Sequence, residues 1–158
     1  MEQIVQLNSN AKLSEHFSLG EFTKSNSHPE IYNIPSHEAI QNMKRLCGWL
    51  EVLRKRYNEK YGIGEEPIRI NSGYRSPQLN RKIGGVATSN HLTGCAVDIR
   101  VAGMEQLLRY AVILLDYADE SKQEFDELLV EKNRHGAIWL HFAVRPAGNR
   151  RKVAFLQA

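Results

Sequence analysis

The decapeptide Ser89–Asp98, SNHLTGCAVD, carries two side chains that could bind a metal ion. His91 and Asp98 lie seven positions apart in it, separated by a Thr-Gly turn and small residues. A third candidate, His141, lies in the segment Ala137–Val144, whose residues alternate as in a strand. Two imidazoles and one carboxylate are a ligand set of catalytic zinc sites, which leave the fourth tetrahedral position for water. If the three side chains converge, the sequence predicts a metal-dependent hydrolase.

The strand patterns predict the direction of these side chains. In the first expected strand, residues 95–101, Asp98 shares a face with Ala96, whose small side chain leaves space beside the carboxylate. In the second strand His141 shares a face with Trp139. The opposite face of the second strand is apolar and consists of Ile138, Leu140, Phe142 and Val144. A histidine on the less apolar face of such a strand is placed to face a cleft.

Helices are expected to surround these strands. The strongest spans residues 36–62, because apolar residues repeat there at three- and four-residue steps and Ser36 suits an N-cap. Shorter elements are helices near residues 16–22, 76–84 and 104–117, a strand at 67–71, and two strands at 126–132 and 137–144 that form a hairpin. Since helices precede a cluster of strands, we expect an α+β fold with helices packed on a small, mainly antiparallel sheet.

The composition is that of one globular domain. Its 158 residues are 42% hydrophobic and 25% charged, and no linker stands out, so residues 1–158 are expected to form a single domain with residues 1–12 and 146–158 peripheral. The net charge of +3 is too small to indicate nucleic-acid binding but suits an anionic polymer such as a bacterial cell wall. No segment approaches the roughly 18 apolar residues of a membrane span, so no membrane insertion is expected.

The motif around the first two candidate ligands resembles a known family. The pattern SxHxxGxAxD from Ser89 to Asp98, followed by a Trp-x-His strand, is similar to zinc D-Ala-D-Ala carboxypeptidases and L-alanyl-D-glutamate peptidases. Residues 71–77, NSGYRSP, resemble the SGYRS segment of that family, and residues 17–22, FSLGEF, resemble its N-terminal helix. The similarity covers roughly residues 16–144. It implies the fold that these peptidoglycan-cleaving enzymes share with the hedgehog signalling domain.

The resemblance also implies roles for individual residues. His91, Asp98 and His141 would bind one Zn²⁺ ion. Arg75 would bind a substrate carboxylate or polarise the scissile carbonyl, which suits a guanidinium because it matches carboxylates in bidentate fashion and stabilises a developing oxyanion. Ser89 would lie beside the zinc and hydrogen-bond the substrate.

The general base is less well specified. The family uses a glutamate, aspartate or histidine, often a few residues before the last zinc ligand. Ile138 and Trp139 lie three and two residues before His141, and neither can accept a proton. Trp139 is expected instead to contact substrate as a wall of the cleft. Glu131, at the end of the preceding strand, is the nearest candidate, and we predict that it is the catalytic base.

The register of the hairpin decides whether Glu131 can act. A four-residue loop would pair Glu131 with Ile138 and turn it away from the metal, whereas a five-residue loop would pair it with Trp139 and turn it toward the metal. The sequence leaves both registers open. His135 and Asp126 are therefore kept as alternative bases.

The resemblance implies a zinc metallopeptidase that hydrolyses a bond next to a D-amino acid in the peptidoglycan stem peptide, as a carboxypeptidase or an endopeptidase. We expect a monomer. No signal-peptide pattern is found at residues 1–6, so the protein is expected to be cytoplasmic as synthesised and to act at the wall after release, as a phage or prophage endolysin does. The alternative is a metal-stabilised, non-catalytic module of the same fold that binds the cell wall or a partner.

Overall fold

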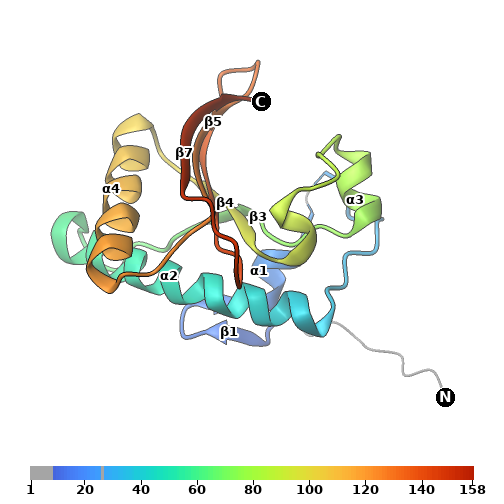
Figure 1. Ribbon diagram of the computed structural model, residues 1–158, viewed down its shortest axis with the longest axis horizontal. Coiled ribbons are helices and arrows are strands. Elements are labelled where there is room, and N and C mark those ends of the chain that lie inside the picture. Colours follow the sequence, from blue (N-terminus) through green and yellow to red (C-terminus); the bar gives the residue numbers. More distant parts are fainter. Residues whose placement is uncertain (1–8, 26) are drawn as a thin grey trace.

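The computed structural model describes residues 9–25 and 27–158, in which helices pack against a five-stranded sheet (Figure 1). The strands of this sheet are, in spatial order, β3 (Ile70–Ser72), β4 (Ala96–Arg100), β6 (Ile138–Ala143), β5 (Glu127–Lys132) and β7 (Lys152–Gln157). Neighbouring strands are antiparallel except β5 and β7, which are parallel. β4 and β6 occupy the second and third positions of the sheet, so the two strands expected to carry ligands lie side by side.

Two long helices cover one face of the sheet. α2 (His37–Tyr61) begins at Ser36, whose side chain accepts a hydrogen bond from the Ala39 amide at 3.1 Å, as expected for the N-cap. α4 (Met104–Ser121) packs against α2 and β6. The buried side chains between helices and sheet include Leu46, Leu50, Leu53, Val97, Ile99, Leu107, Leu140 and Phe142. Burying this apolar face, at about 25 cal/mol for each Å² removed from water, is the main force that holds helices to sheet.

This packing fixes which face of the sheet is left for chemistry. Trp49 of α2 lies against Phe142 of β6, with ring centroids 5.3 Å apart. Because side chains alternate along a strand, the residues on either side of Phe142, His141 and Ala143, point away from the helices. The less apolar face predicted from the sequence is therefore the one turned away from α2 and α4.

The short N-terminal elements support the segment that precedes α3. They are β1 (Lys12–Ser14), β2 (Phe17–Ser18) and α1 (Leu19–Thr23), and α3 spans Pro77–Lys82. α1 begins after Ser18, which forms a capping box with Glu21. The Phe22 carbonyl accepts a hydrogen bond from the Tyr74 amide at 2.7 Å. α1 is thereby tied to the Gly73–Arg75 segment.

The C-terminal end differs from the expectation. The sequence analysis expected no strand in residues 146–158, but Lys152–Gln157 form β7 at the edge of the sheet and pair along the whole of β5. At the other end, Lys12 already belongs to β1, while the remainder of the expectation for residues 1–12 falls partly on residues 1–8, which lie outside the described part of the chain. Within the described residues, no helix combines the length and the apolar character that crossing a membrane requires.

Candidate metal centre and active site

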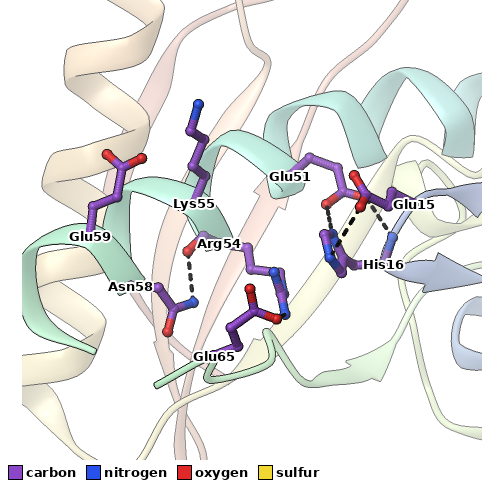
Figure 2. Close-up of a pocket in the computed structure, with 8 residues that line it drawn as sticks. All are labelled: Glu15, His16, Glu51, Arg54, Lys55, Asn58, Glu59 and Glu65. Carbon is purple, nitrogen blue, oxygen red and sulfur yellow. Dashed lines mark hydrogen bonds and ion pairs between the residues drawn. The ribbon is translucent and has the colours of Figure 1, made fainter. Parts of the chain in front are cut away.

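A cavity of about 430 Å³ beside α2 is lined by charged and polar residues (Figure 2), none of which belongs to the sequence motif. His16 and Glu51 meet there, with Nδ1 and Oε1 2.6 Å apart, and Arg54 lies 3.4 Å from Glu65. The Glu51 carboxylate is also bound by Ser14 Oγ and by the His16 amide. These contacts account for the cluster as a set of paired charges on the surface.

The motif residues meet on the other face of the sheet, where Asp98 and His141 are direct partners across β4 and β6. Directly opposed residues of an antiparallel pair point to the same side of the sheet. Both side chains therefore project from the sheet face that is turned away from the helices. The two residues are 43 positions apart in the chain and are brought together by strand register alone.

The third residue, His91, lies on a 3₁₀ turn, Asn90–Thr93, that precedes β4. The turn begins at Ser89, whose Oγ accepts a hydrogen bond from the His91 amide at 3.1 Å. It ends at Gly94, which has a φ of +74°. A Cβ at Gly94 would lie 2.5 Å from the Ala39 carbonyl oxygen of α2, so glycine is required by both the backbone angle and the close approach.

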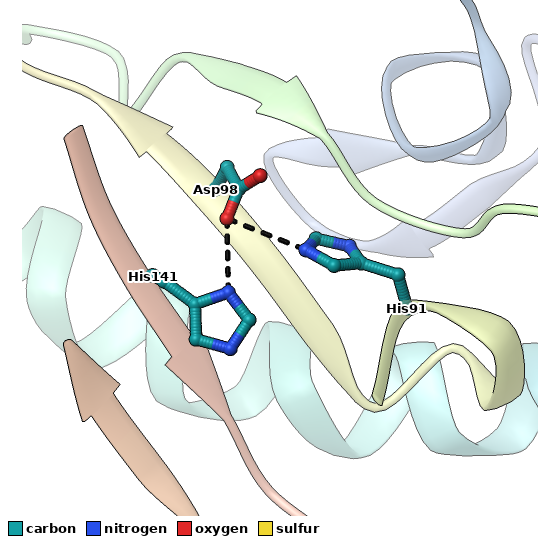
Figure 3. A group of neighbouring side chains, drawn as sticks. All are labelled: His91, Asp98 and His141. Atoms are coloured by element: carbon teal, nitrogen blue, oxygen red, sulfur yellow. Dashed lines mark hydrogen bonds and ion pairs between the residues drawn. The ribbon is translucent and has the colours of Figure 1, made fainter. Parts of the chain in front are cut away.

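His91, Asp98 and His141 form a compact, buried group (Figure 3). Asp98 Oδ1 lies 3.0 Å from His141 Nδ1 and 3.3 Å from His91 Nε2. One candidate ligand atom from each residue lies within 4.8 Å of the other two. The side chains are 3%, 10% and 8% exposed, respectively. This is the spacing at which three atoms can share one ion.

The outer nitrogen of each imidazole faces a hydrogen-bond acceptor. His91 Nδ1 lies 2.6 Å from the Gly73 carbonyl oxygen, and His141 Nε2 lies 3.0 Å from Glu127 Oε1. A carbonyl or ionised carboxylate oxygen can only accept, so these contacts favour the tautomer with its proton on the outer nitrogen. In a neutral ring the inner nitrogen then offers a lone pair. Two imidazole lone pairs and the Asp98 carboxylate converge, which is a donor set that fits Zn²⁺.

The charges in this group respond to one another. Burial alone would raise the pKa of Asp98, but the His91 and His141 rings outweigh it and hold that pKa far below its usual range. Burial alone would lower the pKa of His141. Hydrogen bonds to Asp98 and Glu127 outweigh burial, so the net shift of this pKa is upward. The group therefore favours a positive charge at its centre.

Arg75 forms an ion pair with the second carboxylate oxygen of Asp98. Its Nη2 lies 3.4 Å from Asp98 Oδ2, on the side away from the imidazoles. Its Nε donates to Ser72 Oγ at 3.2 Å and its amide donates to the His91 carbonyl at 3.0 Å. Burial lowers the pKa of the guanidinium, although the neighbouring Asp98 and Glu131 charges oppose that shift. The guanidinium is thus fixed at the rim of the group, beside the ligand carboxylate.

The hairpin between β5 and β6 has the five-residue loop. Lys132 pairs with Ile138 and Glu131 pairs with Trp139, so Glu131 lies on the same face as His141. Glu131 Oε1 is 4.0 Å from His141 Nδ1, the nitrogen that also faces Asp98. Glu131 therefore lies beside the inner nitrogen of His141, next to the group formed by the two histidines and Asp98. Burial together with the Asp98 charge raises the pKa of Glu131.

Trp139 contacts Glu131 directly. Its indole Nε1–H donates a hydrogen bond to Glu131 Oε2 at 2.6 Å. The sequence assigned Trp139 to the substrate cleft, and the side chain is half-buried on that face. The hydrogen bond gives it a contact that the sequence alone did not indicate.

The two alternative bases lie in other environments. Asp126 is fully buried, and Arg150 donates to it from both Nε and Nη2 at 3.0 and 2.9 Å. His135 is exposed on the hairpin loop, where its ring contacts Arg134. Ser89 acts as the cap of the 3₁₀ turn described above. Of the candidate bases, Glu131 is the one beside the group formed by the two histidines and Asp98.

The sequence analysis missed Glu127. Its carboxylate accepts from the outer nitrogen of His141 and from Asn90 Nδ2, at 3.0 and 2.6 Å. The signal was present in the alternation of β5, because Glu127 and Glu131 are four residues apart and therefore share a face. A search for carboxylates on the face of Glu131 would have found it.

Comparison with known proteins agrees with this geometry. Residues 15–120 match the family described as Peptidase M15. The chain belongs to this peptidase family. Ser89, His91 and Asp98 fall within the matched region, as does Arg75, whereas His141 lies beyond it and joins the group through the pairing of β4 and β6.

The chain is also similar in sequence to a curated protein. The chain is 27% identical over 97 residues to the zinc D-Ala-D-Ala carboxypeptidase of Streptomyces albus G. The aligned part is 61% of this chain and 36% of that protein. The M15 chain thus spans about a third of the length of the curated relative it matches.

Proposed function

We propose that this M15 peptidase is a zinc-dependent hydrolase of the peptidoglycan stem peptide that cleaves next to a D-amino acid. The observation that carries the proposal is the convergence of His91, Asp98 and His141 at a buried site beside the Glu131 carboxylate. The name of the Streptomyces albus G relative supports zinc and a D-Ala-D-Ala peptide as the ion and the substrate class. The same kinship supports a hedgehog-type fold.

In this proposal His91, Asp98 and His141 hold one zinc ion. Histidine and aspartate are common zinc ligands, and three of them leave a coordination position open. When bound, the ion supplies Lewis acidity, which lowers the pKa of a water molecule and polarises the carbonyl under attack.

Glu131 is the general base of the proposed reaction. Its carboxylate lies on the inner side of the group, 4.0 Å from His141 Nδ1, and can accept a proton from the attacking water. Glu131 then gives this proton to the nitrogen of the leaving amine as the carbon–nitrogen bond breaks. Water thereby supplies the hydroxyl of the new carboxylate and the hydrogen of the new amine.

Arg75 binds the oxygen on which negative charge develops, or a carboxylate of the substrate. Its Nη2 is held 3.4 Å from Asp98, so its remaining donors are presented at the rim without further ordering. Trp139 forms one wall of the site and Ser89 flanks it at the start of the 3₁₀ turn; both are proposed substrate contacts. We further propose that the protein works as a monomer on the bacterial wall, in the manner of an endolysin.

A muropeptide digest tests the proposal. Wild-type protein is stripped with a chelator, reloaded with zinc and incubated with disaccharide pentapeptides and with cross-linked muropeptides, and the products are identified by mass spectrometry. We expect product only with zinc, with free D-alanine indicating a carboxypeptidase and separated stem peptides an endopeptidase. Zinc binding with no product from any of these substrates would contradict the peptidase and would indicate the non-catalytic binding module instead.

A further inference from the structure

We propose that Glu127 is a positioning residue that holds His141 in the orientation of a metal ligand by binding the outer nitrogen of its ring. The proposal rests on the metal site of the proposed function. Glu127 begins β5 and is opposed to Ala143 of β6, two residues beyond His141. Its side chain leaves the sheet on the face of His141, and the small Ala143 leaves room for it to reach the imidazole.

The contact is directed at the outer nitrogen of the ring. Glu127 Oε1 lies 3.0 Å from His141 Nε2, while Nδ1 faces Asp98 at 3.0 Å. Glu127 therefore contacts the outer nitrogen of the His141 ring, whereas Glu131 lies on the same sheet face nearer the inner nitrogen. A carboxylate behind a ligating histidine keeps the outer nitrogen protonated, holds the ring plane and increases the basicity of the inner nitrogen. These three effects all favour binding of a metal through Nδ1.

Glu127 is itself held at both oxygens. Asn90 Nδ2 donates to Oε1 at 2.6 Å, and Arg150 Nη2 lies 3.4 Å from Oε2. Asn90 Oδ1 in turn accepts from Arg145 Nε at 2.9 Å, so its amide cannot rotate without losing bonds on both sides. A carboxylate with this many partners has few alternative rotamers and can impose an orientation on its neighbour.

Asn90 also connects the two histidines. It is the residue directly before His91 on the 3₁₀ turn, and through Glu127 it reaches His141 on β6. The Asn90–Glu127 pair therefore fixes the turn that carries one ligand relative to the strand that carries another. This connection crosses from the family-matched region, which ends at residue 120, to the part of the chain beyond it.

Zinc affinity tests the proposal without reference to activity. Glu127→Ala and Glu127→Gln are compared with wild type by competition against a chromophoric zinc chelator, and Glu124→Gln, which removes an exposed charge three residues away, is the matched control. We expect Glu127→Ala to lower the affinity about 10- to 100-fold, since this is the usual effect of losing such a partner. Glu127→Gln, which keeps an accepting oxygen but no charge, should lower it less, and Glu124→Gln should not change it.

A second measurement reports the ring directly. In the zinc-loaded wild type, long-range ¹H–¹⁵N correlation spectra should show the His141 proton on Nε2, and in Glu127→Ala the signals of this ring should shift or broaden. Thermal unfolding of each variant separates loss of fold from loss of orientation. Wild-type zinc affinity in a folded Glu127→Ala, or a His141 proton on Nδ1 in the wild type, would overturn the proposal.

The two proposals fail in different ways. A protein that binds zinc with the expected dependence on Glu127 but hydrolyses no muropeptide contradicts the peptidase and supports the role of Glu127. A protein that hydrolyses muropeptides with zinc and is indifferent to Glu127→Ala contradicts only the positioning role. A wild type that binds no zinc contradicts both.

Discussion

Glu131 and Trp139 face each other across the β5–β6 hairpin, and the indole Nε1–H donates a hydrogen bond to the Glu131 carboxylate at 2.6 Å. This contact exists because the hairpin loop has five residues rather than four. It holds one oxygen of Glu131 and leaves the other, Oε1, facing His141 at 4.0 Å. The oxygen on the metal side is the one that the proposed base would use.

Removal of this hydrogen bond should leave Glu131 less well positioned without affecting zinc binding. In Trp139→Phe the indole donor is lost while an aromatic wall is kept. We expect kcat to fall about fivefold to tenfold, the equivalent of one hydrogen bond of about 1 kcal/mol, with zinc affinity unchanged. Steady-state kinetics on a muropeptide, together with the chelator competition, measure both quantities. An unchanged kcat would mean that the contact does not position Glu131.

Asp98→Asn should abolish tight zinc binding. The amide has the shape of the carboxylate but removes the negative charge that both imidazoles and Arg75 face. We expect zinc affinity to fall on the order of 100-fold or more, which exceeds the usual effect of changing a partner outside the ligand set. Zinc content after gel filtration, measured by atomic emission, checks this. Asp119→Asn, which changes an exposed carboxylate on α4, is the matched control and should retain zinc.

Asp126 should contribute to stability in a defined pH range. Burial alone would raise its pKa, but hydrogen bonds from Arg150 and Asn90 outweigh this and lower the pKa to about 2. A carboxyl group whose pKa is lower in the folded than in the unfolded protein stabilises the fold above its unfolded pKa of about 4. The stabilisation is lost as the pH falls from about 4 to about 2.

The variant Asp126→Asn should therefore be less stable than wild type at pH 7, by about 1.5 to 3 kcal/mol, since it loses hydrogen bonds between charged groups. The difference should shrink as the pH falls through the range given above. Urea unfolding followed at pH 7, 4 and 2.5 measures it. A difference that stays constant across these pH values would show that the charge of Asp126 is not what stabilises the fold.

Gly94→Ala should destabilise the protein and displace the turn that carries His91. The φ of +74° is unfavourable for alanine, and its Cβ would lie 2.5 Å from the Ala39 carbonyl oxygen. We expect a loss of about 2 kcal/mol or more in the free energy of unfolding. Gly48→Ala is the control, because Gly48 is exposed within α2 and its Cβ would meet nothing within 4 Å. That change should stabilise α2 by about 0.5–1 kcal/mol, and equal effects at both sites would contradict the account of the turn.

Much of the fold follows from local patterns in the sequence. The apolar repeat of α2, its Ser36 cap and the alternation of β4 and β6 depend on neighbours in the chain, so these elements and the face that carries Asp98 and His141 could be predicted. The register between β5 and β6 could not. A slip of one residue reverses the face of Glu131, and no turn signal in the loop decides between the two lengths.

Other features depend on partners distant in the chain. β7 was not expected because its side chains are largely exposed and give no pattern of burial, while its pairing with β5 is a parallel contact. Glu127 has no motif of its own. Its contact with His141 arises from the β5–β6 register and its contact with Asn90 from the position of the 3₁₀ turn, and neither is visible in the sequence.

The most direct test of the account compares zinc-loaded wild type with Glu131→Gln on the same muropeptides at equal zinc content. Glu131→Gln retains the size of the side chain and removes its ability to accept a proton. We predict that wild type releases new amine and carboxylate termini, detected by mass spectrometry, and that the variant is about 10²- to 10⁴-fold slower. A Glu131→Gln variant with the wild-type rate, or a zinc-loaded wild type that releases no new termini, would contradict the account.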